Sequence, residues 1–158
     1  MLGEFRKAWK NYEKGLNLSE ELGIGFAIAR RRVRLGQTAL ALGDFTLARE
    51  HLAEGLAVGG EVSDNWALLM ALGGFGCQAK EQSQPEYACR LLGATQFQLD
   101  SFGGYFFPLD QREYDLTLDQ VRTMLHPDAF KSIWEEGRAM TMETAMRYAL
   151  ELNDTGAG

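Results

Sequence analysis

The chain has 158 residues, an apolar fraction of 46% and a net charge of -6, with 16 basic and 22 acidic side chains. This size and composition suit one globular domain or a short helical array, and the negative charge opposes binding to a phosphate backbone. The sequence has no run of about 18 apolar residues and no signal-peptide pattern. We therefore expect a cytoplasmic protein that binds neither nucleic acid nor membrane.

Apolar residues at helical spacing, together with the positions of glycine and proline, predict helices along the whole chain. The first helix is the clearest, because Phe5, Trp9, Tyr12 and Leu16 recur three or four residues apart. The alternation with a period of two that strands require is nearly absent. The expected class is all-α, with helices at about 4–21, 24–42, 45–58, 64–82, 85–101, 109–125, 128–139 and 141–152.

The N-terminal part repeats with a period of about 40 residues. The small residues that share this spacing are Ala8, Ala48, Ala88, Gly36 and Gly76. They predict close packing, with glycine on the first helix of each pair and alanine on the second. The phrase Leu2-Gly3-Glu4-Phe5 returns as Leu42-Gly43-Asp44-Phe45. It predicts a turn, because glycine accepts the left-handed conformation that ends a helix and the acid caps the next one.

The repeat stops after residue 101, where Gly103 and Gly104 break the helical pattern. Beyond this point Pro108 and Pro127 predict new helix starts, and Gly137 predicts a helix end. We expect two and a half repeats in residues 1–102, C-terminal helices packed on the last repeat in 103–152, and a disordered tail in 153–158.

Leu35-Gly36, Leu42-Gly43-Asp44-Phe45 and Ala48 resemble a tetratricopeptide repeat in its longer form. The segments 88–94, 130–140, 143–145 and 148–150, with Tyr114, resemble the C-terminal region of bacterial transcriptional regulators that contain an ATPase domain, of the LuxR, AfsR or MalT kind. The resemblance implies a right-handed superhelix of antiparallel helical hairpins with a C-terminal helical cap. It departs from the family at Arg32, where such repeats usually hold a bulky apolar residue.

The same resemblance implies a non-catalytic module for protein interaction and regulation of transcription. The alternative that it leaves open is an arm that senses a small-molecule inducer. Because the chain opens at the turn Leu2-Gly3, without the first helix of its first repeat, we expect a fragment of a longer regulator. The expected partners are a protein, a peptide or the missing N-terminal domains.

Catalytic and metal-binding patterns are not found in the sequence. His51 and His126 belong to separate parts of the chain and have no nearby nucleophile of known mechanism. Cys77 and Cys89 are too few for a zinc site, and we expect both to be buried. We therefore expect no catalytic residue, no metal and no cofactor.

Arg30, Arg34 and Gln37 share one helix face, since they are spaced by four and three residues. In tetratricopeptide arrays the first helix of each hairpin lines the concave groove. These three residues could therefore bind an acidic peptide, a C-terminal carboxylate or a phosphorylated ligand. The alternative, which we favour at this stage, is a solvated face paired with glutamates of the adjacent helix.

Two aromatic groups are further candidates for contact with a ligand or partner. Tyr105 and Phe106, with Phe107, either plug the join between the repeats and the tail or line a small-molecule pocket, and the plug is the simpler interpretation. Phe5, Trp9 and Tyr12 form a stripe of which one side lacks a covering helix. We expect a self-associating surface there, which could form a homodimer.

Overall fold

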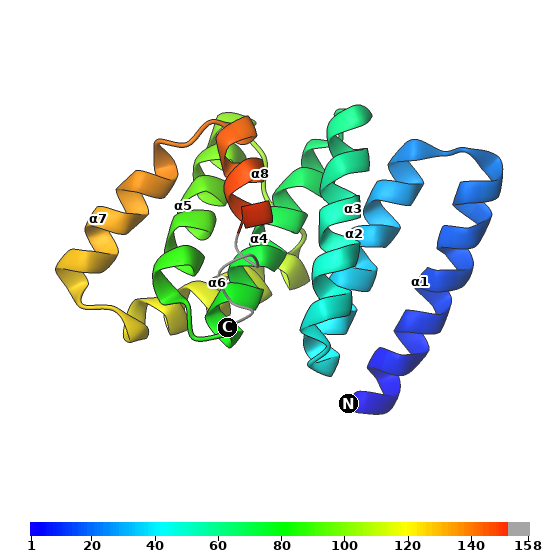
Figure 1. The fold of residues 1–158 in the computed structure, drawn as a ribbon, viewed down its shortest axis with the longest axis horizontal. Helices are drawn as coiled ribbons and strands as arrows, with labels where there is room; N and C mark the ends of the chain where they lie inside the picture. The colour runs from blue at the N-terminus through cyan, green and yellow to red at the C-terminus, as the bar shows by residue number, and fades with distance from the viewer. Residues whose placement is uncertain (152–158) are drawn as a thin grey trace. The chain divides into compact units, whose positions relative to one another are not determined.

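The computed structural model describes residues 1–151, and these residues form helices joined by short turns, without a strand. The expected all-α class is therefore confirmed. The predicted tail at 153–158 lies outside the described residues. The helices are α1 (Leu2–Leu22), α2 (Gly25–Leu42), α3 (Phe45–Glu61), α4 (Asn65–Glu81), α5 (Pro85–Ser101), α6 (Pro108–Met124), α7 (Pro127–Arg138) and α8 (Met142–Glu151) (Figure 1).

The chain forms two compact units, one from Met1 to Gly74 and one from Phe75 onward. The boundary falls inside α4, whereas the predicted repeats end at residue 102. In the first unit α2 packs against both α1 and α3, and the three helices run alternately up and down (Figure 1). In the second unit α5 contacts α6, α7 and α8.

Helices α1 to α5 all end in the same turn, which recurs at every twentieth position of the chain. In each turn one N–H donates to the carbonyl three residues earlier, and the next N–H donates to the carbonyl five residues earlier, as in a Schellman motif. Each repeat of the sequence is therefore made of two halves with the same turn. The left-handed residues are Gly23 (φ 65°), Gly43 (φ 79°), Ser63 (φ 54°), Ser83 (φ 58°) and Gly103 (φ 60°).

Ser63 and Ser83 hold this left-handed conformation with a side chain, which costs an L-residue about 1 kcal/mol. We expect Ser83→Gly to raise the free energy of unfolding by about 0.5 kcal/mol, because relief of that strain outweighs the greater freedom of glycine in the unfolded chain. Urea denaturation would measure the change. Ser132→Gly, inside α7, is the control and should lower stability by a similar amount. A Ser83→Gly protein less stable than the parent would contradict this prediction.

Glycine brings α2 and α3 into close contact in the first unit. A Cβ atom at Gly36 would lie 2.6 Å from Leu52 Cγ and 3.1 Å from the Ala48 carbonyl oxygen. A Cβ at Gly55 would lie 2.7 Å from Val33 Cγ2. Val33, Ala48 and Leu52 are each 0% exposed, so these glycines face a closely packed core. The close packing that Gly36 and Ala48 predict for this hairpin is confirmed.

The second unit contains the equivalent contact, one sequence repeat further along the chain. A Cβ at Gly76 would lie 3.1 Å from Leu92 Cδ2 and 3.7 Å from the Ala88 carbonyl oxygen. Ala88 and Leu92 are again 0% exposed. The regular spacing of these residues therefore has a physical cause, since glycine, alanine and leucine occupy the same places in two α-helical hairpins.

Two of the predicted glycine turns are helical instead. α1 already begins at Leu2, with Met1 as its N-cap, so Gly3 lies in the first turn of a helix and not in a loop. Gly137 lies within α7 and is buried there. Its small size serves packing, because a Cβ would overlap the carbonyl oxygen of Arg90 on α5. Gly93 of α5 makes the complementary approach, 2.6 Å from its Cβ position to the Trp134 carbonyl oxygen.

Candidate binding surface

Arg30 of α2 is fixed by Asp64, the residue that precedes α4. Arg30 Nε donates to Asp64 Oδ2 at 2.6 Å, and Nη2 donates to Oδ1 at 3.2 Å. The Asp64 side chain is only 2% exposed, whereas that of Arg30 is 52% exposed. Asp64 Oδ1 also accepts from the Ala67 backbone N–H at 3.2 Å, so it caps α4 as well. The hydrogen bond with Asp64 raises the pKa of Arg30, which stays charged.

The indole ring of Trp66, at the start of α4, lies against the guanidinium groups of Arg30 and Arg34. The guanidinium carbon of Arg30 is 5.3 Å from the centre of the indole ring, and that of Arg34 is 5.0 Å from it. Both distances are in the range of a cation–π contact. Arg34 Nη1 also donates to Gln37 Oε1 at 3.0 Å. The indole Nε1 is buried and has no hydrogen-bond partner among the described residues.

These contacts hold two guanidinium groups in fixed positions on one aromatic side chain. Asp64 balances the charge of Arg30, whose side chain is 52% exposed. A planar guanidinium donates paired hydrogen bonds to carboxylate or phosphate oxygens, and an aromatic support reduces the entropy that it loses on binding. The surface is therefore suited to an anionic group.

The sequence correctly placed Arg30, Arg34 and Gln37 together. The alternative interpretation, pairing with glutamates of the adjacent helix, does not describe Arg30, whose partner is an aspartate in the turn before α4. Asp64 and Trp66, which also belong to this surface, were not predicted from the sequence. The available signal was an Asp at the start of an expected helix with an aromatic residue two positions later.

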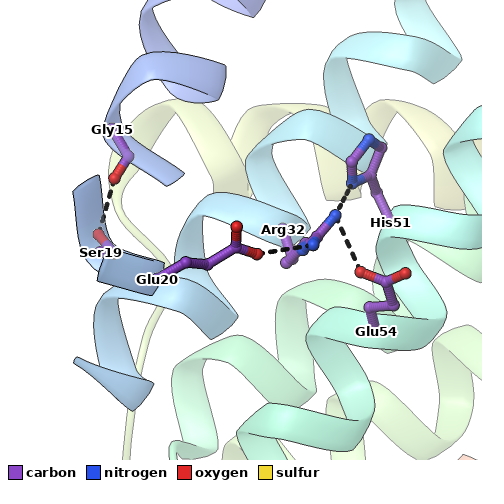
Figure 2. A network of polar contacts seen from close by, with 6 residues as sticks. All are labelled: Gly15, Ser19, Glu20, Arg32, His51 and Glu54. Atoms are coloured by element: carbon purple, nitrogen blue, oxygen red, sulfur yellow. Dashed lines mark hydrogen bonds and ion pairs between the residues drawn. The ribbon is translucent and has the colours of Figure 1, made fainter. Parts of the chain in front are cut away.

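Arg32 occupies the position where the resemblance implies a bulky apolar residue, and it joins three helices (Figure 2). Its Nη2 donates to Glu20 Oε1 of α1 at 2.8 Å, and its Nη1 lies 2.9 Å from Glu54 Oε2 of α3. Its Nη1 is also 3.3 Å from His51 Nδ1. The Arg32 side chain is 22% exposed, so a half-buried charge takes the place of an apolar contact here.

His51 lies between Arg32 and the ring of Trp9. The Trp9 and His51 rings meet edge to face, with centroids 5.3 Å apart. Burial, followed by the charge of Arg32, lowers the pKa of His51. The neutral imidazole is therefore the form that this site favours.

The aromatic loop divides into one buried and two exposed side chains. Phe106 is 5% exposed and lies 5.5 Å from the ring of Tyr114, whereas Tyr105 is 85% and Phe107 62% exposed. The Tyr114 hydroxyl donates to the Leu92 carbonyl oxygen at 2.8 Å, and burial raises its pKa. Phe106 thus fills the core of the second unit. Tyr105 and Phe106 therefore face different surroundings, one solvent and the other the core.

The aromatic stripe of α1 is half-buried, and the exposed apolar side chains lie elsewhere on this helix. Phe5, Trp9 and Tyr12 are all partly covered. Leu18 and Leu22 are 56% and 62% exposed. If α1 contacts another protein, the leucines offer more apolar area for that contact than the predicted aromatic residues do.

The two cysteines differ in burial. Cys89 is buried and Cys77 is half-buried, and burial raises the pKa of both thiols, to about 11 for Cys89. Within residues 1–151, no three His, Cys, Asp or Glu side chains gather closely enough to share a metal ion. None of the helices in this range combines the length and hydrophobicity that a membrane crossing requires.

The chain was compared with known families, characterised proteins and solved structures. No family model matches it, and no curated protein or solved structure matches it either.

Proposed function

We propose that this chain is a non-catalytic protein-interaction module, built from hairpins of the tetratricopeptide type that form a right-handed superhelix. The repeated contacts of Gly36 with Ala48 and of Gly76 with Ala88 support this fold, as do the regularly recurring turns. The residues that resemble bacterial transcriptional regulators support a role as a regulatory part of such a protein in the cytoplasm.

The observation that carries the binding role is the pair of arginines held on Trp66. Arg30 donates to the buried Asp64, so we assign the contact with an anionic ligand to Arg34, whose guanidinium lies against the Trp66 ring. Gln37 holds Arg34 from the next turn of α2 and adds an amide donor. The partner of this surface is an acidic segment of a protein, bound through its carboxylates.

The test is binding of a ten-residue glutamate-rich peptide, labelled with fluorescein and followed by anisotropy at low salt. Arg34→Gln should weaken binding roughly tenfold, which corresponds to the loss of one charge-assisted hydrogen bond. Arg34→Lys keeps the charge but loses the planar group on Trp66, so it should fall between the parent and Arg34→Gln.

Arg6→Gln is the matched control, since it removes the same charge from an exposed position of α1. It should change the affinity by less than about twofold, because screening weakens distant charges. A peptide with glutamine in place of glutamate should not bind. Equal weakening by Arg6→Gln and Arg34→Gln, or no binding by the parent protein, would overturn the proposed surface.

A further inference from the structure

Side chains of α1 and α3 converge on Arg32 of α2 (Figure 2). Arg32 reaches Glu20 of α1 on one side, and it reaches Glu54 and His51 of α3 on the other. Trp9 of α1 rests on the His51 ring. The outer helix is thus connected to α3 at two places, through the Arg32 guanidinium and through the Trp9–His51 contact.

This arrangement requires a neutral His51. Arg32 has donors only, so the imidazole Nδ1 at 3.3 Å from Arg32 Nη1 must be the acceptor. A proton on Nδ1 would remove the acceptor and place a second positive charge beside the guanidinium. The Trp9 ring covers the imidazole from α1 and leaves less room for water around the new charge.

The charges of four neighbouring side chains act on the pKa of His51. Arg32 from α2 opposes protonation, whereas Glu54 and Glu50 from α3 and Glu13 from α1 favour it. Burial is the largest influence and also opposes protonation, so the pKa of His51 is lowered despite the three glutamates. Below the ordinary pKa of about 6.5 the free imidazole therefore binds a proton more readily than the imidazole in this contact.

We propose that Trp9, His51, Arg32 and Glu20 form an acid-sensitive latch, which holds α1 against α2 and α3 at neutral pH and loosens on acidification. The contribution of the latch to stability is complete above about pH 6.5, and it is lost progressively as the pH falls from that value towards the lowered pKa of His51. Leu16 and Ser19, each 4% exposed, lie on the face of α1 that opening would uncover. The device goes beyond the proposed peptide-binding surface, because it makes exposure of an apolar face depend on pH.

The experiment is hydrogen exchange of the backbone amides of α1 at pH 7.5 and 5.5, corrected for the intrinsic exchange rates. If only the open form binds the proton, the opening constant of α1 rises by at most about tenfold at pH 5.5. We expect a rise of several-fold in α1.

Two variants distinguish the latch from a general effect of acid. His51→Asn keeps an acceptor near Arg32 but does not titrate, so the exchange of α1 should change less than twofold between the two pH values. His126→Asn is the matched control at an exposed histidine and should respond like the parent. Equal exchange of α1 at both pH values in the parent, or the same acid response in His51→Asn, would overturn the proposal.

Glu20→Gln tests the other end of the latch. It should raise the opening of α1 at both pH values, because the charged contact with Arg32 is weakened. The acid response should persist, since His51 is retained. A Glu20→Gln protein without an acid response would show that the carboxylate, and not the imidazole, is the sensitive group, and this result too would overturn the proposal.

Discussion

Gly137→Ala is expected to lower the free energy of unfolding by about 2 kcal/mol or more, through overpacking between two helices. The added Cβ would overlap the Arg90 carbonyl oxygen and lie 2.9 Å from both Arg90 C and Cα. These are backbone atoms, which cannot rotate out of the way, so α5 and α7 must move apart. Such overpacking costs about 1–3 kcal/mol and sometimes more, and it outweighs the gain of up to about 1 kcal/mol from alanine in a helix. Urea denaturation followed by circular dichroism measures the change.

Gly73→Ala is the matched control for this result. Gly73 also lies inside a helix, α4, but no atom is within 4 Å of its Cβ position. The alanine should therefore raise the free energy of unfolding by about 0.5–1 kcal/mol, because it lowers the conformational entropy of the unfolded chain and meets no atom in the folded one. The opposite signs of the two substitutions are the prediction. If Gly137→Ala were neutral, the close approach of α5 and α7 would be contradicted.

The second large effect is expected from Asp64→Ala, which should lower the free energy of unfolding by about 2 kcal/mol. Asp64 has two partners, since it accepts from the Ala67 N–H and from the Arg30 guanidinium. Loss of a capping aspartate costs about 1 kcal/mol, and the charged hydrogen bonds add about as much. Arg30 is half exposed and can be solvated after the substitution, which limits the cost.

Asp44→Ala is the control that separates the two roles of Asp64, the helix cap and the pair with Arg30. Asp44 caps α3 by accepting from the Leu47 N–H at 3.0 Å, which matches the capping contact of Asp64 at 3.2 Å. Asp44 is exposed, and this cap is the contact that the structure describes for its side chain, so its loss should cost only about 1 kcal/mol. Thermal or urea unfolding of both variants tests the difference. Equal losses would mean that Arg30 adds nothing to the stability of this turn.

The sequence predicted the features that depend on a local pattern or on a repeat. The spacing of Phe5, Trp9 and Leu16 predicted the first helix, and Gly43 with Asp44 predicted the turn and cap that the structure contains. The pairing of Gly36 with Ala48 followed from their recurrence at Gly76 and Ala88. These inferences succeeded because small residues and turn residues have few other uses in a helix.

Features that depend on contacts between residues far apart in the sequence could not be predicted from local patterns. Ser63 and Ser83 adopt the left-handed turn although serine has no preference for it, because the surrounding helices impose the conformation. Arg30 and Asp64 are far apart in the sequence, and their pairing depends on how α2 meets the start of α4. His51 follows Glu50 in the sequence, and nothing in that local pattern indicates its contacts with Trp9 and Arg32 from two other helices.

The evenly spaced turns have a consequence for how such a chain can change in length. A residue inserted within a helix rotates everything after it by about 100°, which would misplace the packing face. A copy of residues 25–64 would instead begin just after one turn, at Gly23, and end just after an equivalent turn, at Ser63. Duplication of this segment would keep every following helix in phase. The chain can therefore grow or shrink by whole hairpins during evolution, at the cost of new end surfaces.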